Sequence, residues 1–120
     1  MYEIHGELGG KLIVIRCAGF WDEAELAAYC AAVLRAGRAA EGPFDMLVDM
    51  RDFPAQTAAG GPEIAATAGE LIRMGMRHAA VLAPSAVQRM QVNRLSEGRH
   101  VFFDDEPEAR TWLRRMRMAS

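Results

Sequence analysis

Four aspartates lie at the carboxyl ends of predicted strands, and these residues have the clearest capacity for chemistry. They are Asp49, Asp52, Asp104 and Asp105. The carboxyl ends of parallel strands share one edge of a sheet, and carboxylate oxygens gathered there suit Mg²⁺. A simpler interpretation is that Asp105 caps a helix and that Asp49 and Asp52 pair with Arg51 or with nearby backbone amides. The sequence therefore predicts no metal site and no cofactor.

Nucleophilic catalysis has one candidate, Ser85, which follows another apolar run. A serine nucleophile needs a histidine base, and the sequence does not show whether His5, His78 or His100 comes near it. The histidines also lack metal-ligand spacing, and the sequence contains no nucleophile elbow, P-loop or dinucleotide fingerprint. We therefore expect no catalytic residues and a protein that is not an enzyme.

Length and composition are those of one soluble domain. The chain has 120 residues, 51% of them hydrophobic and 25% charged, so a single domain over 1–120 is expected. A net charge of -2 gives no reason to expect nucleic-acid binding. No apolar run approaches the roughly 20 residues of a membrane-spanning helix, and no secretory signal pattern opens the chain. A cytoplasmic protein with two reduced thiols, Cys17 and Cys30, is predicted.

The first half of the chain predicts a strand hairpin followed by a helix. Alternating residues over 2–8 and the apolar run Leu12–Ile15 indicate two strands, joined at Gly9-Gly10 by a tight two-residue turn. Asp22 and Glu25 form a capping box, which predicts a helix from Asp22 to Ala36. Gly37 is expected to stop that helix in a left-handed conformation.

Three further strand and helix pairs follow. Strands are predicted over 44–50, 78–83 and 99–103, and helices are predicted to begin at Pro62, Ser85 and Asp105. The last helix should bury Ala109, Trp112, Leu113 and Met116 and expose Arg110, Arg114 and Arg117. This order predicts an α/β fold, with four helices on a five-stranded, mostly parallel mixed sheet that opens with the hairpin.

The element order resembles the STAS-like group, the fold of the sporulation anti-sigma-factor antagonists, and its uncharacterised bacterial STAS/SEC14-like branch. The resemblance covers nearly the whole chain and is carried by the N-terminal hairpin, the long loop after Phe44–Met50, and Phe102-Phe103-Asp104-Asp105 before the last helix. It implies a non-enzymatic regulatory domain that binds proteins or small ligands. The Asp-Ser-Xaa-Gly motif of phosphorylated antagonists is absent here, which argues against a phosphorylation switch.

The first functional hypothesis is a protein-interaction domain that uses the long loop and the start of the next helix. The candidate interaction residues are Arg51, Asp52, Phe53, Thr57, Gly60, Gly61 and Pro62. Thr57 is the only hydroxyl residue in the stretch that matches the phosphorylated motif. A sheet edge or face that helices leave uncovered would also allow a homodimer.

The second hypothesis is a binder or sensor of a small apolar ligand or lipid, in line with the SEC14 side of the resemblance. Eight methionines are present, and flexible thioethers can line an adaptable apolar pocket. Trp21, Phe53, Met74 and Met76 are the candidate lining residues. Core packing is the alternative explanation for the methionines.

Overall fold

The computed structural model describes residues 1–53, 61–83, 85–96 and 100–119. In these segments five strands form one sheet in the order β1-β2-β3-β4-β5. The strands are β1 (Tyr2–Glu7), β2 (Leu12–Ala18), β3 (Phe44–Asp52), β4 (Met76–Leu82) and β5 (His100–Phe103). β1 and β2 are antiparallel, and every later pair is parallel. The predicted mixed sheet with an N-terminal hairpin is confirmed.

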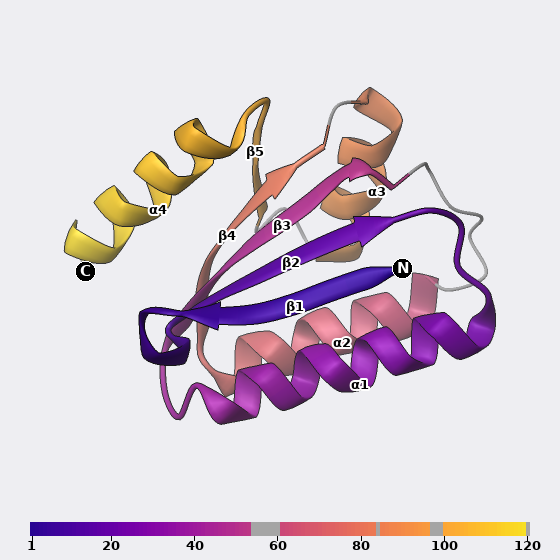
Figure 1. Ribbon diagram of the computed structural model, residues 1–120, viewed down its shortest axis with the longest axis horizontal. Helices are drawn as coiled ribbons and strands as arrows, with labels where there is room; N and C mark the ends of the chain where they lie inside the picture. The colour runs from indigo at the N-terminus through magenta and orange to yellow at the C-terminus, as the bar shows by residue number, and fades with distance from the viewer. Residues whose placement is uncertain (54–60, 84, 97–99, 120) are drawn as a thin grey trace.

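Helices cover both faces of this sheet unequally (Figure 1). They are α1 (Glu23–Ala39), α2 (Gly61–Met74), α3 (Ala86–Ser96) and α4 (Glu106–Ala119). α1, α2 and α3 pack on one face, and α4 lies alone on the other, where it contacts β3, β4 and β5. On this face α4 is the one helix that the described segments supply.

The core consists of two apolar layers, one on each face of the sheet. Alternate residues of a strand point to opposite faces, so Ile13 and Ile15 pack toward α1 and α2, whereas Leu12 and Val14 belong to the layer under α4. These four side chains are at most 5% exposed. The continuous apolar run in β2 is thus the signature of a strand covered on both sides.

The hairpin turn differs from the prediction. Glu7 pairs with Leu12, so four residues connect the strands, and Leu8–Gly10 forms a short 3₁₀ turn. Leu8, Gly9 and Gly10 all have positive φ angles, so the expected left-handed backbone is present but extends over three residues. The predicted two-residue turn is wrong because the strands separate one residue earlier on each side.

Gly37 does not stop α1, and that prediction is wrong as well. The helix continues to Ala39, and Gly37 is buried inside it. A Cβ atom at this position would lie 3.1 Å from both Leu71 Cδ2 and Met74 Sδ of α2. The glycine therefore permits close approach of two helices. Asp22 does cap α1, since its side chain accepts from the Glu25 amide as predicted.

α4 follows its predicted pattern except at one position. Asp105 caps it by accepting from the Glu108 amide, and Ala109 and Leu113 are buried against the sheet. Arg110, predicted to point outward, is instead half-buried and pairs with Glu7 of β1. At this position on α4, Arg110 lies next to the carboxylates of Glu7 and Glu106 rather than over apolar side chains.

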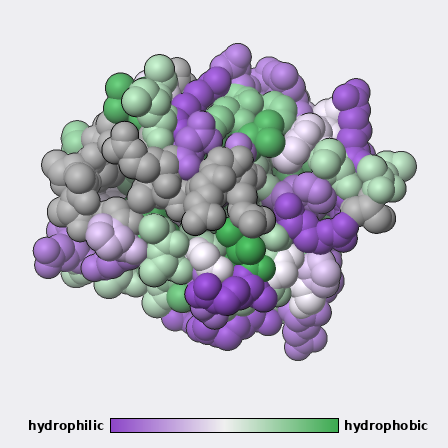
Figure 2. Space-filling view, turned by 180° about the vertical axis from the view of Figure 1, so that it is seen from behind, coloured by the Kyte–Doolittle hydropathy of each residue, from purple (hydrophilic) through white to green (hydrophobic). Residues whose placement is uncertain are grey.

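The surface seen from behind mixes hydrophobic and hydrophilic residues, with small apolar areas separated by polar ones (Figure 2). Among the described residues, no helix combines the length and the apolar character that crossing a membrane requires.

Candidate functional site

The ends of β2 and β3 form one continuous rim with the start of α1. Ala18 pairs with Asp52, and the Gly19 amide donates to the Asp52 carbonyl oxygen at 3.1 Å. The Trp21 indole donates to the Ala18 carbonyl oxygen at 3.0 Å. These bonds fix the chain where it leaves the sheet, at the same end of the molecule as the starts of α1 and α2 (Figure 1).

Phe53 anchors this rim. Its side chain is only 8% exposed, and its ring lies 4.7 Å from the Trp21 ring in an edge-on arrangement. The buried Gln88 side chain of α3 donates to the carbonyl oxygens of Phe53 and Met50. Phe53 is thus held by α3 through its backbone and by the segment before α1 through its ring.

Gln88 is itself positioned by a capping box at the start of α3. The backbone amide of Gln88 donates to Ser85 Oγ at 3.1 Å, and the Ser85 hydroxyl donates to Gln88 Oε1 at 3.0 Å. A single side chain therefore caps one helix and binds the end of the neighbouring strand. Gln88 therefore links the N-terminal cap of α3 to the end of β3.

Two exposed apolar residues are next in sequence to the residues that hold Phe53. Phe20 is 77% exposed and precedes Trp21, which contacts the Phe53 ring. Val87 is 55% exposed and precedes Gln88, which binds the Phe53 backbone. We call the set Phe20, Arg51, Asp52, Phe53 and Val87 the strand-end rim. It offers exposed hydrophobic groups on a backbone fixed from two sides.

The predicted interaction residues differ in their burial and in their position along the chain. Arg51 and Asp52 are exposed residues at the end of β3, whereas Phe53 is the buried anchor. Gly61 is the first residue of α2, and Pro62 is exposed in its first turn. Thr57 and Gly60 lie outside the described residues.

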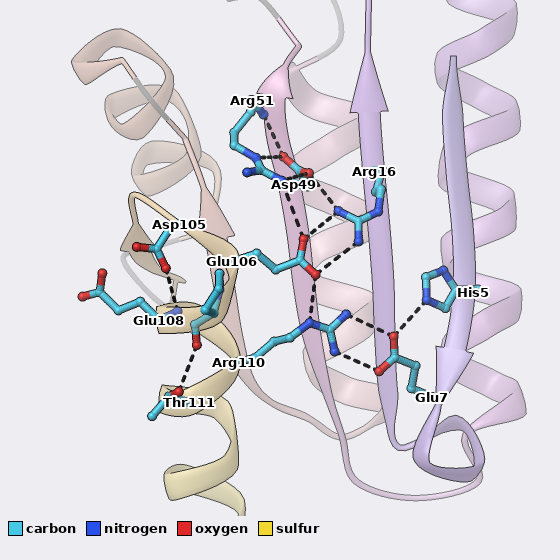
Figure 3. Close-up of polar contacts among 11 residues, drawn as sticks. His5, Glu7, Arg16, Asp49, Arg51, Asp105, Glu106, Glu108, Arg110 and Thr111 are labelled. Atoms are coloured by element: carbon cyan, nitrogen blue, oxygen red, sulfur yellow. Dashed lines mark hydrogen bonds and ion pairs between the residues drawn. The ribbon is translucent and has the colours of Figure 1, made fainter.

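A chain of alternating charges runs from the rim across the α4 face of the sheet (Figure 3). Arg51 holds Asp49 through two side-chain hydrogen bonds of 3.0 and 2.8 Å. Asp49 also accepts from Arg16 at 2.9 Å, and Arg16 donates twice to Glu106 of α4. The chain of charges begins at Arg51 of the rim and continues into α4.

The same chain continues to the sheet edge. Glu106 accepts from Arg110 one turn later at 2.9 Å, and Arg110 donates to both oxygens of Glu7 at 2.9 and 3.1 Å. His5 Nε2 lies 3.0 Å from Oε2 of Glu7, an oxygen that also accepts from Arg110. Three arginines and three carboxylates thus join β1, β2, β3 and α4, and their charges sum to zero. These contacts hold α4 against the sheet.

These pairings change the protonation of the carboxylates. Hydrogen bonds from Arg110 and then His5 lower the pKa of Glu7 to about 2. Hydrogen bonds from Arg16 and Arg110 lower the pKa of Glu106. Burial opposes ionisation of Asp49, but the bonds from Arg51 and Arg16 outweigh it and lower its pKa. All three groups are therefore carboxylates at neutral pH.

The other side chains considered for catalysis or metal binding already have hydrogen-bond partners within the fold. Asp49 is held by two arginines, Asp105 caps α4, and the Ser85 hydroxyl bonds to Gln88. Burial lowers the pKa of His100 to about 4, which leaves this imidazole neutral at pH 7. The described residues contain no group of three or more potential metal ligands.

The residues predicted to line an apolar pocket separate into two places. Trp21 and Phe53 pack together at the strand-end rim. Met76 pairs with Phe44 at the other end of β3, and Met74 packs near Gly37. Nine strand residues, roughly 30 Å, separate the two ends, and all four side chains pack against one apolar core. A ligand held by all four is not favoured.

Sequence reasoning missed Phe20 and Gln88. The signal for Gln88 was present, because Ser85 and Gln88 have capping-box spacing, but only the fold shows that the amide also reaches Phe53. Phe20 follows Gly19 outside the strand pattern, and nothing in its local sequence shows that its side chain is exposed.

A solved structure has the same architecture over nearly the whole chain. It is that of the anti-sigma factor antagonist SpoIIAA in its unphosphorylated form, with a TM-score of 0.67 and 16% sequence identity over 95% of this chain and 96% of that one. No family model and no curated protein sequence matches. The protein therefore has the STAS-like, SpoIIAA-like fold, as the resemblance implied.

Proposed function

We propose that this protein is a non-enzymatic regulatory domain of the cytoplasm that binds a protein partner through the strand-end rim. The observation that carries the proposal is that two exposed apolar residues, Phe20 and Val87, each adjoin in sequence a residue that holds Phe53. Exposed apolar groups on a preorganised backbone lose little conformational entropy when they are covered. Such groups supply much of the energy of protein interfaces.

The similarity to SpoIIAA supports the same class of function. That protein is an anti-sigma factor antagonist, a regulator that acts on another protein. The present chain shares its fold, and the residues before α2, which the sequence pointed to first, continue directly from the rim. In this proposal the partner contacts Phe20, Arg51 and Asp52 together with the segment up to Pro62.

Affinity capture from an extract of the native host tests the proposal. The tagged wild-type protein is compared with Phe20→Ser and with a control, Met118→Ser, which removes an equally exposed apolar side chain in the last turn of α4. A partner retained by wild type and Met118→Ser but lost by Phe20→Ser is the expected result. A partner that all three proteins retain equally, or none at all, contradicts the proposal.

A further inference from the structure

Acidic side chains gather at the end of the molecule that bears the strand-end rim. β2 to β5 are parallel, so their carboxyl ends, and the starts of the helices that follow them, lie at this end (Figure 1). The first turns of α1, α2 and α4 contain five glutamates: Glu23, Glu25, Glu63, Glu106 and Glu108. Asp22 and Asp105 are the N-caps of α1 and α4. We call this end of the molecule the acidic end.

The strand ends add three more carboxylates, Asp49, Asp52 and Asp104. From the last four residues of each of these strands to the first turn of the next helix, the chain has three arginines. Arg16 and Arg51 pair with Asp49, and Arg89 pairs with Asp104. Ten carboxylates against three arginines leave an excess of seven negative charges, even when every ion pair is counted.

The remaining charges do not cancel this excess at the acidic end. Residues 54–60 and 84, which belong to the same connections, include no charged residue type. At the start of β1, the Met1 ammonium group and Glu3 contribute one charge of each sign. Because the whole chain has a net charge of -2, the rest of it carries an excess of five positive charges.

Part of that positive charge lies at the opposite end of the sheet. The last turns of α1, α2 and α4 contain Arg38, Arg73 and Arg117, where the first turns contain glutamates. Acidic first turns and basic last turns both stabilise helices, but Asp52 and Asp104 belong to no helix. The protein is therefore polarised, with the strand-end rim at its negative end.

We propose that the partner meets the strand-end rim with a basic surface that encloses an apolar contact. The exposed Phe20 stands two residues before Asp22, and Asp52 directly precedes the anchored Phe53, so apolar and acidic groups share one surface. Complementary charge raises the association rate and disfavours wrong partners, while the apolar groups supply binding energy. The polarity of the protein also turns its rim toward a basic partner during the approach. The basic partner rests on the proposed function and specifies its chemistry.

Titration with two synthetic peptides, followed by NMR of the backbone amides, tests this partner chemistry. Both peptides alternate leucine with a charged residue, which is lysine in one and glutamate in the other. The lysine peptide should shift the amides of Phe20, Asp52, Phe53 and Val87, and the glutamate peptide should leave them unchanged. Raising NaCl from about 0.1 M to about 1 M shortens the Debye length from about 10 Å to about 3 Å, so the lysine peptide should then bind more weakly.

Two double variants with the same net charge separate the rim from general charge attraction. Asp52→Asn with Glu63→Gln removes two exposed charges of the acidic end and leaves both N-caps intact. Glu41→Gln with Glu70→Gln removes two charges near the ends of α1 and α2, at the opposite end. The first pair should weaken binding of the lysine peptide by about threefold or more, and the second by less than about twofold.

Equal binding of the two peptides, equal weakening by the two double variants, or shifts spread over the whole surface would overturn the basic partner. Absence of any shift at the rim would do the same. Salt-sensitive self-association of the protein alone, measured by sedimentation velocity, would assign the acidic end to the basic end of a second copy and would also contradict it. A protein crosslinked from position 20 keeps the rim as an interface even when the lysine peptide fails, so the two failures are distinguishable.

Discussion

The Gln88 side-chain amide of α3 donates to the carbonyl oxygen of Phe53, 35 residues earlier in the chain. This bond joins the first turn of a helix to the end of the neighbouring strand, directly before the segment predicted to contact a partner. The rim therefore depends on one buried amide that satisfies the carbonyls of Met50 and Phe53 and also takes part in the Ser85 cap.

Replacement of Gln88 by alanine should destabilise the fold. The variant removes the Gln88 donor from the Phe53 carbonyl oxygen and from the Met50 carbonyl oxygen, which keeps the Phe53 amide at 3.1 Å. It also removes half of the capping box, so the free energy of unfolding should fall by about 1–3 kcal/mol. Urea unfolding followed by circular dichroism measures this change. Asn93→Ala is the control, because Asn93 is an exposed polar residue of the same helix. Equal stability of the two variants would show that the Gln88 bonds contribute little.

The charge chain should make the protein sensitive to acid. Because the folded-state pKa of Glu7 is about 2 against an ordinary 4.5, its pairing stabilises the fold fully above pH 4.5 or so. That contribution decreases as the pH falls through 4.5 toward 2, since protonation then favours the unfolded chain. The lowered pKa values of Glu106 and Asp49 act in the same direction.

Melting temperatures between pH 7 and pH 2 check this expectation. The wild-type protein should lose stability steadily below pH 4.5, and Glu7→Gln should start lower at pH 7 and decline less steeply. Glu3→Gln, at an exposed residue of the same strand, should follow the wild-type curve. Parallel curves for wild type and Glu7→Gln would refute the assigned role of the Arg110 pair.

Gly37 should tolerate no branched side chain. Valine at this position would drive its methyl groups into Leu71 and Met74, which already lie 3.1 Å from the first added carbon. Overpacking of this kind costs about 1–3 kcal/mol. Thermal unfolding of Gly37→Val should show the loss, whereas Ala36→Val, one residue earlier and only half-buried, should cost less. A stable Gly37→Val variant would mean that α1 and α2 can separate freely.

The two cysteines should differ in reactivity. Burial, and then the charge of Asp49, raises the pKa of the Cys17 thiol to about 12, so almost no thiolate is present at pH 8. Cys30 is only partly buried on α1. Iodoacetamide at pH 8 should label Cys30 in the native protein and Cys17 only after unfolding, which peptide mass spectrometry can resolve. Faster labelling of native Cys17 would contradict the packing of β2 against α1.

The sheet and its helices were predictable because their signals are local. Apolar runs marked the buried strands, and Asp22 and Asp105 marked two helix starts through capping boxes that the structure confirms. Gly37 misled because a glycine that stops a helix and one that admits a neighbouring helix look alike until α2 is in place.

The charge chain was not predictable for a different reason. Arg110 and Glu7 are 103 positions apart, and each residue alone looks like an ordinary surface charge. Their contact depends on α4 crossing the sheet face that no other described helix covers, a relation between elements that no local pattern contains. The same holds for Gln88 and Phe53.

Photo-crosslinking at the rim tests the proposed function most directly. A photoreactive amino acid replaces Phe20 in one protein and Met118 in another, both at highly exposed positions, and each is irradiated in cells of the native host. A distinct protein partner crosslinked from position 20, competed away by untagged protein and absent from position 118, is the predicted result. Crosslinks of equal yield from both positions, or only from position 118, would contradict recognition at the strand-end rim.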